Sequence, residues 1–439
     1  MRRVWLIISI VIIALLCGCG CKLTSNISEE EVYITKLNYT PDFNYIKVPQ
    51  TPSLITDRLG YEPAGKKVVF LRTDNTDADY SIVDMNTDKV VYEGIMTKMD
   101  ITGDESTHLY TGDFSDFITE GTYRILQENV GYSYPFEIKK DIYKDFNKEI
   151  YGRVANAKYA KTADLIYVLA NLMMTKDIYT DSYSNETFIR NSIERLMKSQ
   201  DVTSGVVYDL LTVSDELDGE ESLSTTAEYA GVMAQFYQMH KEDADELVLA
   251  ALQAANMAFQ YVDKYRDNVW ADSYYYASAE MYRATGQIKY RNAIALYDQM
   301  DIGARQLSQY GYELLADVAY LKSEYKVDYN RCEEIMKNYL NDMVKLSALT
   351  DKQHFYVQSN IDELSEDDII DHMMKLGLVG YVVSGHEYAS IQGNYIHYLL
   401  GVNGNKRDYM LDGMENVPIG ENILELSRLI FVFGSKYEL

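Results

Sequence analysis

The chain has few cysteines and few positive charges for its length. Only 4 of its 439 residues are cysteines, and Cys332 is the sole one after residue 21. A disulfide framework is therefore excluded, and stability must come from packing. Lys and Arg number 41 against 67 Asp and Glu, which gives a formal net charge of −26. Such a chain repels a phosphate backbone, so we expect no nucleic-acid partner.

The sequence also lacks an apolar run long enough for a permanent membrane helix, which needs about 20 residues. The longest run, Val4–Leu16, follows two arginines and precedes small residues, as in an export signal. Residues 16–19, Leu-Cys-Gly-Cys, resemble a bacterial lipobox. This resemblance implies removal of residues 1–18 and a lipid on Cys19 that anchors the protein to the membrane at the bacterial cell surface. The alternative is a cleaved signal with incidental cysteines.

Composition divides the remaining chain into three parts. Residues 19–52 are polar and aperiodic, which is typical of a tether. Residues 53–140 contain short β-branched and aromatic runs between turn residues, which predict a β-sandwich. Residues 141–439 show helical spacing of apolar residues, which predicts about eleven helices, and the absence of a fixed-length repeat favours an α/α toroid over a solenoid. The expected strands are Lys66–Arg72, Tyr80–Met85, Lys89–Glu93, His108–Gly112, Thr122–Gln127 and Ser133–Ile138. The clearest helical stripes lie at 160–174, 227–237, 247–262, 307–321, 332–346, 388–399 and 423–433.

Several blocks, in order along the chain, resemble glycoside hydrolase family 9 cellulases. DRLGYEPAGKK (Asp57–Lys67) and two later blocks, 80–94 and 110–125, are similar to the immunoglobulin-like domain that precedes the barrel in many members. In the helical part the similar blocks are 193–209, 222–237, 272–290, 397–410 and 421–433. The resemblance implies an immunoglobulin-like β-sandwich followed by an (α/α)6-type helical barrel, here truncated at its first helical hairpin. It also implies that the protein handles β-glucan or a related polysaccharide.

The resemblance places the family's general acid at Glu421. The family cleaves β-1,4-glucans with inversion, which also requires a carboxylate base about 6.5 to 9.5 Å away. That base lies, in family members, on a Gly- and Trp-flanked loop with paired aspartates, and no such loop precedes Ile193 here. Only scattered acids stand between Ile138 and Ile193, such as Asp141, Asp145, Asp164 and Asp177. We therefore expect hydrolysis to be weak or lost; alternatively, Glu421 is simply an acid placed favourably at a helix N-terminus.

Two other clusters have both a functional and a structural interpretation. Trp270, Tyr274 and Tyr275 are flat rings at the start of a helix, which can stack on sugars or pack in the core. An acidic run, 215–221, offers oxygen ligands for Ca²⁺, although a solvated turn is the simpler interpretation. The six histidines show no metal-binding spacing, and we expect no other cofactor.

Three hypotheses for function follow from these patterns. The first is a degenerate or weakly active β-glucan hydrolase. The second is a non-catalytic glycan-binding or scaffold lipoprotein. The third is a surface protein that binds a partner and no sugar.

Overall fold

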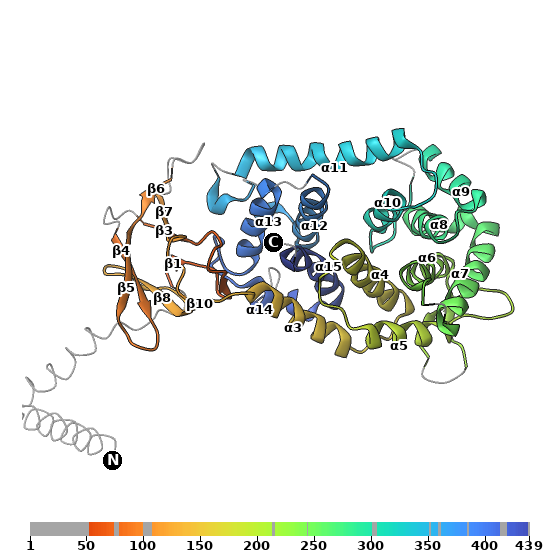
Figure 1. The fold of residues 1–439 in the computed structure, drawn as a ribbon, viewed down its shortest axis with the longest axis horizontal. Coiled ribbons are helices and arrows are strands. Elements are labelled where there is room, and N and C mark those ends of the chain that lie inside the picture. Colours follow the sequence, from red (N-terminus) through yellow and green to blue (C-terminus); the bar gives the residue numbers. More distant parts are fainter. Residues whose placement is uncertain are drawn as a thin grey trace, which may run out of the picture.

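The protein is described from a computed structural model. The structure describes residues 52–73, 79–99, 108–212, 216–243, 245–300, 305–350, 353–358, 361–383, 386–412 and 419–437. The expected signal (residues 1–18), its lipidation site Cys19 and nearly all of the expected tether lie outside the described residues. Figure 1 shows a small β-domain at one end and a ring of helices at the other.

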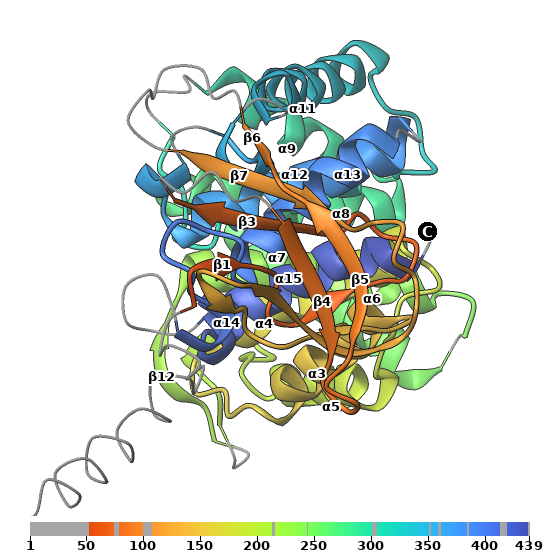
Figure 2. The same cartoon turned by 90° about the vertical axis from the view of Figure 1, so that its left-hand side faces the viewer.

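Two stacked sheets form the β-domain (Figures 1 and 2). The strands are β1 (Leu54–Ile55), β2 (Gly60–Tyr61), β3 (Val68–Arg72), β4 (Asp79–Asp84), β5 (Val90–Ile95), β6 (Thr97–Lys98), β7 (Leu109–Asp113), β8 (Gly121–Gln127), β9 (Gly131–Tyr132) and β10 (Phe136–Ile138). One sheet has the order β1-β3-β7-β6, and the other has the order β2-β10-β8-β4-β5, with β9 paired to β8. All six expected strands are present, with shifted ends.

Alternation of side chains along the strands builds the core of the sandwich. Val69 and Leu71 of β3 point between the sheets, where they meet Ile82 of β4 and Tyr123 and Ile125 of β8. Successive residues of a strand face opposite sides, so these residues form one apolar layer and their neighbours face away from it.

The chain beyond Ile138 is mainly helical. The α-helices are α3 (Ile142–Asn156), α4 (Thr162–Ile178), α5 (Glu186–Met197), α6 (Leu223–His240), α7 (Glu246–Lys264), α8 (Ala271–Thr285), α9 (Ile288–Gln299), α10 (Glu313–Leu321), α11 (Tyr329–Thr350), α12 (Glu366–Val383), α13 (His386–Leu399), α14 (Tyr409–Asp412) and α15 (Ile423–Gly434). The 3₁₀ turns are η1 (Arg266–Asn268), η3 (His354–Tyr356), η4 (Ile361–Glu363), η5 (Ile419–Glu421) and η6 (Ser435–Tyr437), and a hairpin of β11 (Tyr208–Leu210) and β12 (Asp218–Glu221) precedes α6. No helix in these ranges is long and apolar enough to cross a membrane.

The helices form an inner and an outer set. Figure 1 shows α4, α6, α8, α10, α12 and α15 in the interior, with α3, α5, α7, α9 and α11 around them. The inner helices α6 and α8 are buried on nearly every side, whereas the outer helix α7 buries one stripe. Small residues permit the close approach of α6 and α8: a Cβ on Gly231 would lie 2.4 Å from the ring of Tyr276.

One expected helix is shorter than its apolar stripe. The stripe at 307–321 predicts a single helix, but α10 begins only at Glu313. The carboxylate of Asp272 explains the difference, because it accepts hydrogen bonds from the backbone N–H groups of Ser308 and Tyr312 and from the Ser308 hydroxyl. These bonds hold residues 308–312 as a loop with Gly311 at φ +69°.

A buried contact between a carboxyl group and an imidazole joins the sandwich to the helices. Nδ1 of His397 on α13 lies 2.7 Å from Oδ2 of Asp57, whose other oxygen accepts the N–H groups of Leu59 and Gly60. Burial raises the pKa of Asp57, and the contact with His397 lowers it in part. Nearby, the N–H of Arg58 donates to the carbonyl of Leu400 at 2.8 Å. The sandwich is thus hydrogen-bonded to the helical domain through both side chain and backbone.

Candidate functional site

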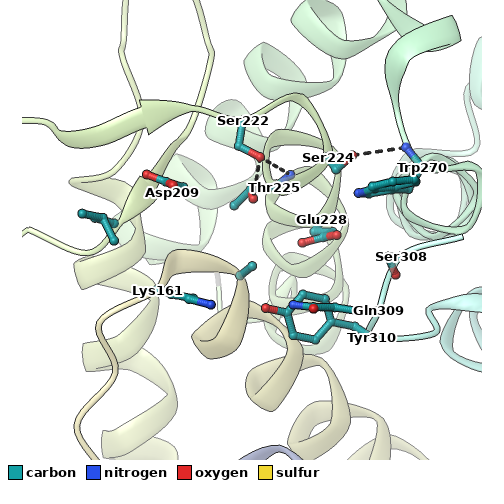
Figure 3. A pocket seen from close by; sticks show the side chains of 12 residues that line it. Lys161, Asp209, Ser222, Ser224, Thr225, Glu228, Trp270, Ser308, Gln309 and Tyr310 are labelled. Carbon is teal, nitrogen blue, oxygen red and sulfur yellow. Dashed lines mark hydrogen bonds between the residues drawn. The ribbon is translucent and has the colours of Figure 1, made fainter.

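A pocket of about 320 Å³ opens where the inner helices begin (Figure 3). We call it the barrel-end pocket, and its lining residues come from the starts of α4, α6 and α8, from β11 and from the loop before α10: Lys161, Ala163, Asp209, Leu210, Ser222, Ser224, Thr225, Glu228, Trp270, Ser308, Gln309 and Tyr310. Helix N-termini carry partial positive charge and unpaired N–H groups, so this end of the helical domain suits polar ligands. The volume is at the lower end of the range for ligand pockets.

Trp270 forms one wall of the barrel-end pocket (Figure 3). It immediately precedes α8, and its backbone N–H donates to the Ser224 hydroxyl of α6 at 3.2 Å. The indole is 42% exposed, unlike the rings that follow it in sequence. A large, fixed and accessible aromatic face beside a polar pocket is suited to stacking on the apolar face of a sugar ring.

Glu228 of α6 lies in the same pocket but is 2% exposed. Its Oε1 accepts a hydrogen bond of 2.8 Å from the Ser273 hydroxyl, and Oε2 has no hydrogen-bond partner. Burial raises the pKa of Glu228 to about 8. The Ser273 hydrogen bond and the nearby Tyr312 hydroxyl oppose this shift, and the charge of Asp272 adds to it. The carboxyl is therefore protonated at neutral pH, and it can donate a hydrogen bond as well as accept one.

The other polar groups of the pocket are held by neighbouring residues. Oδ1 of Asp209 accepts the backbone N–H of Glu220 at 2.8 Å, which fixes Asp209 within the β11–β12 hairpin. The hydroxyl of Tyr310 donates to Oδ1 of Asp164 on α4 at 2.7 Å. Burial raises the pKa of Tyr310, so its hydroxyl stays neutral. Lys161 occupies the position just before α4, where its side chain makes no capping hydrogen bond, and it lies at the edge of the pocket.

Two family models match the chain. The model of the cellulase N-terminal Ig-like domain matches residues 50–131, and that of glycosyl hydrolase family 9 matches residues 198–420, just over half of the chain. The chain belongs to glycosyl hydrolase family 9. No curated protein matches it.

Solved structures of family 9 proteins share the fold. A metagenome-derived family 9 endoglucanase has a TM-score of 0.70 at 15% identity, with 88% of this chain and 99% of that chain covered. A Bacteroides ovatus family 9 protein has a TM-score of 0.69 at 14% identity, over 88% and 98%. AaCel9A in complex with cellobiose-like isofagomine has a TM-score of 0.68 at 13% identity, over 88% and 100%. The expected immunoglobulin-like sandwich followed by an (α/α)6-type barrel is thus confirmed.

Glu421, the expected family acid, does not line the barrel-end pocket. It is exposed at the end of η5, immediately before Asn422, which caps α15. It also lies one residue beyond the segment matched to the family model. Its location at the start of an inner helix resembles that of the pocket residues, but the pocket's own carboxyl groups are those of Glu228 and Asp209.

The scattered acids before Ile193 have other partners. Asp141 and Asp145 pair on the surface with Lys144 and Lys139. Asp177 lies 2.7 Å from Arg283 and 3.3 Å from Lys322. Asp164 holds the Tyr310 hydroxyl, as described above. In the described residues of this segment, therefore, each acid named from the sequence is bonded to another side chain.

Tyr274 and Tyr275, expected as sugar contacts beside Trp270, are buried and do not line its pocket. The Tyr274 hydroxyl donates to Asp263, and the Tyr275 ring stacks on Tyr297 with centroids 4.4 Å apart. The ligand-binding expectation for these two rings is corrected to core packing. The reason is that α8 is an inner helix, buried on nearly every side, whereas Trp270 lies just before its first residue.

Metal binding finds little support in the described residues. No group of three or more His, Cys, Asp or Glu residues there is placed to hold a metal ion. Of the acidic run proposed for Ca²⁺, Asp215 lies outside the described residues, and Asp218–Glu221 forms the exposed strand β12.

Sequence reasoning missed Glu228 as a site residue. It stands within an apolar, alanine-rich stretch, Ala227 to Ala234, on a helix that is buried all round. A single carboxyl among small apolar residues of an inner helix is the sequence signal that could have identified it, since buried acids are rare unless they are paired or functional.

Proposed function

We propose that this protein binds β-glucan-type polysaccharide at the barrel-end pocket, with hydrolysis of glycosyl bonds weak or lost. The observation that carries the proposal is the exposed Trp270 face beside a polar pocket at the helix N-termini of a family 9 barrel. The ligand in the AaCel9A structure, a cellobiose-like isofagomine, supports a short β-glucan as the first probe.

Weak or absent turnover follows from the carboxyl groups present. Inverting hydrolysis needs a protonated acid and a separate ionised base that activates water. The chain has no aspartate-pair loop ahead of Ile193, and Glu421 lies outside the pocket. Loss of a general base removes an effect of about 10²- to 10⁴-fold on the rate.

Calorimetric titration with cellotetraose tests the binding. We expect saturable heat for the wild type and an affinity at least about tenfold lower for Trp270→Ala, equivalent to about 1.4 kcal/mol. Tyr329→Ala is the matched control, because Tyr329 is 82% exposed at the start of α11 and does not line the pocket. Equal affinities for the wild type and Trp270→Ala would refute this site, and a flat wild-type trace would favour the third hypothesis, a protein that binds no sugar.

A reducing-sugar assay on soluble β-glucan separates the two sugar-binding hypotheses. We expect release at the level of the blank, as for a non-catalytic glycan-binding or scaffold protein. Clear release by the wild type that Glu421→Gln abolishes would instead establish a degenerate hydrolase with Glu421 as its acid.

We further propose that a lipid on Cys19 anchors the protein at the bacterial cell surface, as the lipobox-like residues 16–19 suggest. Expression of Cys19→Ala with detergent fractionation tests this. We expect the wild type in the membrane fraction and the variant in the soluble fraction; identical partitioning of the two proteins would refute the anchor.

A further inference from the structure

Two glutamates of the inner helices share an unusual environment. Glu228 of α6 and Glu280 of α8 are 2% and 1% exposed, and each has an Oε2 without a hydrogen-bond partner. Glu280 has a cation within reach, because Nη1 of Arg283 lies 3.9 Å from that oxygen. Among the described residues no lysine or arginine forms an ion pair with Glu228. Glu228 lines the barrel-end pocket, and Glu280 does not.

The surroundings of Glu228 disfavour its ionised form. Its neighbour Asp272 is itself buried, and three donors from Ser308 and Tyr312 hold that carboxylate. The Ser273 hydroxyl donates to Oε1 of Glu228, and the Tyr312 hydroxyl lies close to the same carboxyl group. An uncharged carboxyl in this arrangement accepts at Oε1 and carries its proton at Oε2, which makes no hydrogen bond in the structure, and neither does the hydroxyl of the neighbouring Tyr312.

We propose that Glu228 is a ligand-contacting residue of the barrel-end pocket and donates a hydrogen bond from Oε2 to a hydroxyl or ring oxygen of a neutral sugar. The inference rests on the proposed function and extends it, because it names the polar contact that accompanies stacking on Trp270. A buried donor that makes no hydrogen bond destabilises the protein. A sugar oxygen that reaches this donor would form a hydrogen bond with little competition from water.

Calorimetric titration of the full chain with cellotetraose at about pH 6.5 and about pH 9 tests this role. We expect Glu228→Leu, which has no donor, to bind about tenfold more weakly than the wild type at the lower pH. Glu228→Gln keeps an amide donor and should bind within about threefold of the wild type. Glu280→Gln, the matched control for a buried glutamate outside the pocket, should bind as the wild type does.

The pH dependence gives a second readout. Because the pKa of Glu228 is about 8, the wild type should lose affinity by about tenfold at the higher pH, whereas Glu228→Gln should not. Other titratable groups around Glu228 are common to both proteins, so the difference between their profiles reports Glu228 alone. These groups are Asp272 and Tyr276 of α8, Tyr310 and Tyr312 before α10, Lys161 and Asp164 at the start of α4, and Asp209 of β11.

The outcomes separate this inference from the proposed function. If the wild type binds and Trp270→Ala does not, but both Glu228 variants keep the wild-type affinity and pH profile, the role of Glu228 is wrong and sugar binding stands. If the wild type gives no heat at either pH, both the proposed sugar binding and the role of Glu228 are wrong. Circular dichroism of Glu228→Leu checks that it folds, and Glu228→Gln, which is isosteric with the protonated acid, provides the test if it does not.

Discussion

The buried Glu280 should make the protein less stable as the pH rises from about 5 to 8. Its side chain is 1% exposed on α8, and Oε2 has no hydrogen-bond partner. Burial raises the pKa of Glu280 from 4.5 to about 8, Arg283 lowers it in part, and Asp177 raises it further. In the unfolded chain the same group titrates near its ordinary value. Between these two pKa values the folded protein holds a proton that the unfolded chain has released.

The sign and size of the effect follow from linkage. Stability falls with pH wherever the folded state binds more protons than the unfolded state, here from about 4.5 to about 8. Each such group contributes about 1.4 kcal/mol per pH unit, so Glu280 alone accounts for up to about 5 kcal/mol over the whole interval. Glu228 shares this shift, with a pKa of about 8. The contribution is large beside a typical total stability of about 5–15 kcal/mol.

Urea unfolding followed by far-ultraviolet circular dichroism at about pH 5.5 and 7.5 measures this slope. The difference in free energy of unfolding between Glu280→Gln and the wild type should grow in favour of the variant by up to about 3 kcal/mol from the lower to the higher pH. The control is Glu194→Gln, at an exposed position of α5, which should track the wild type at both pH values. Parallel curves for the wild type and Glu280→Gln would refute the assignment of a proton to Glu280.

Two substitutions test the packing inside the barrel and the contact between the domains. Gly231→Ala places a Cβ 2.4 Å from the Tyr276 ring and should cost about 1–3 kcal/mol, measured as a lower melting temperature; an unchanged melting temperature would contradict the close helix contact. Asp57→Ala leaves His397 without its buried partner at 2.7 Å and should cost about 3–5 kcal/mol in urea unfolding. It should also speed proteolysis between the domains, and unaltered digestion would show that this pair does not hold them together.

The secondary structure of both domains could be predicted well from local patterns. Period-2 runs identify the six longer strands of the sandwich, and the stripe at 247–262 falls within α7. The two-residue strands β1, β2, β6 and β9 were missed, because two residues show no periodicity. The helix predicted from the stripe at 307–321 is too long for another reason. A distant carboxylate, Asp272, satisfies backbone groups that a helix would have used, and one sequence does not reveal that contact.

The site could be predicted only in part. Trp270 could be identified because tryptophan, unlike tyrosine, is rare in this chain, with only 2 in the sequence. The sequence does not show that its neighbours Tyr274 and Tyr275 are buried while Trp270 is exposed. All three residues are aromatic, and their burial depends on how α8 packs against other helices. Glu228 is marked in the sequence only by its apolar, alanine-rich surroundings, and its place at the barrel-end pocket follows only from the packing of the helices.

The protonation of Glu228 favours binding over turnover at this site. A protonated carboxyl can serve as an acid, but inversion also needs an ionised partner that receives a proton from water on the opposite face of the sugar. Asp209 is the other carboxyl group lining the pocket, and one of its oxygens is already bonded to the Glu220 amide. The pocket thus combines a stacking face and a protonated carboxyl with a second carboxyl that is held within the β11–β12 hairpin, an arrangement that fits the proposed binding of a sugar chain better than its cleavage.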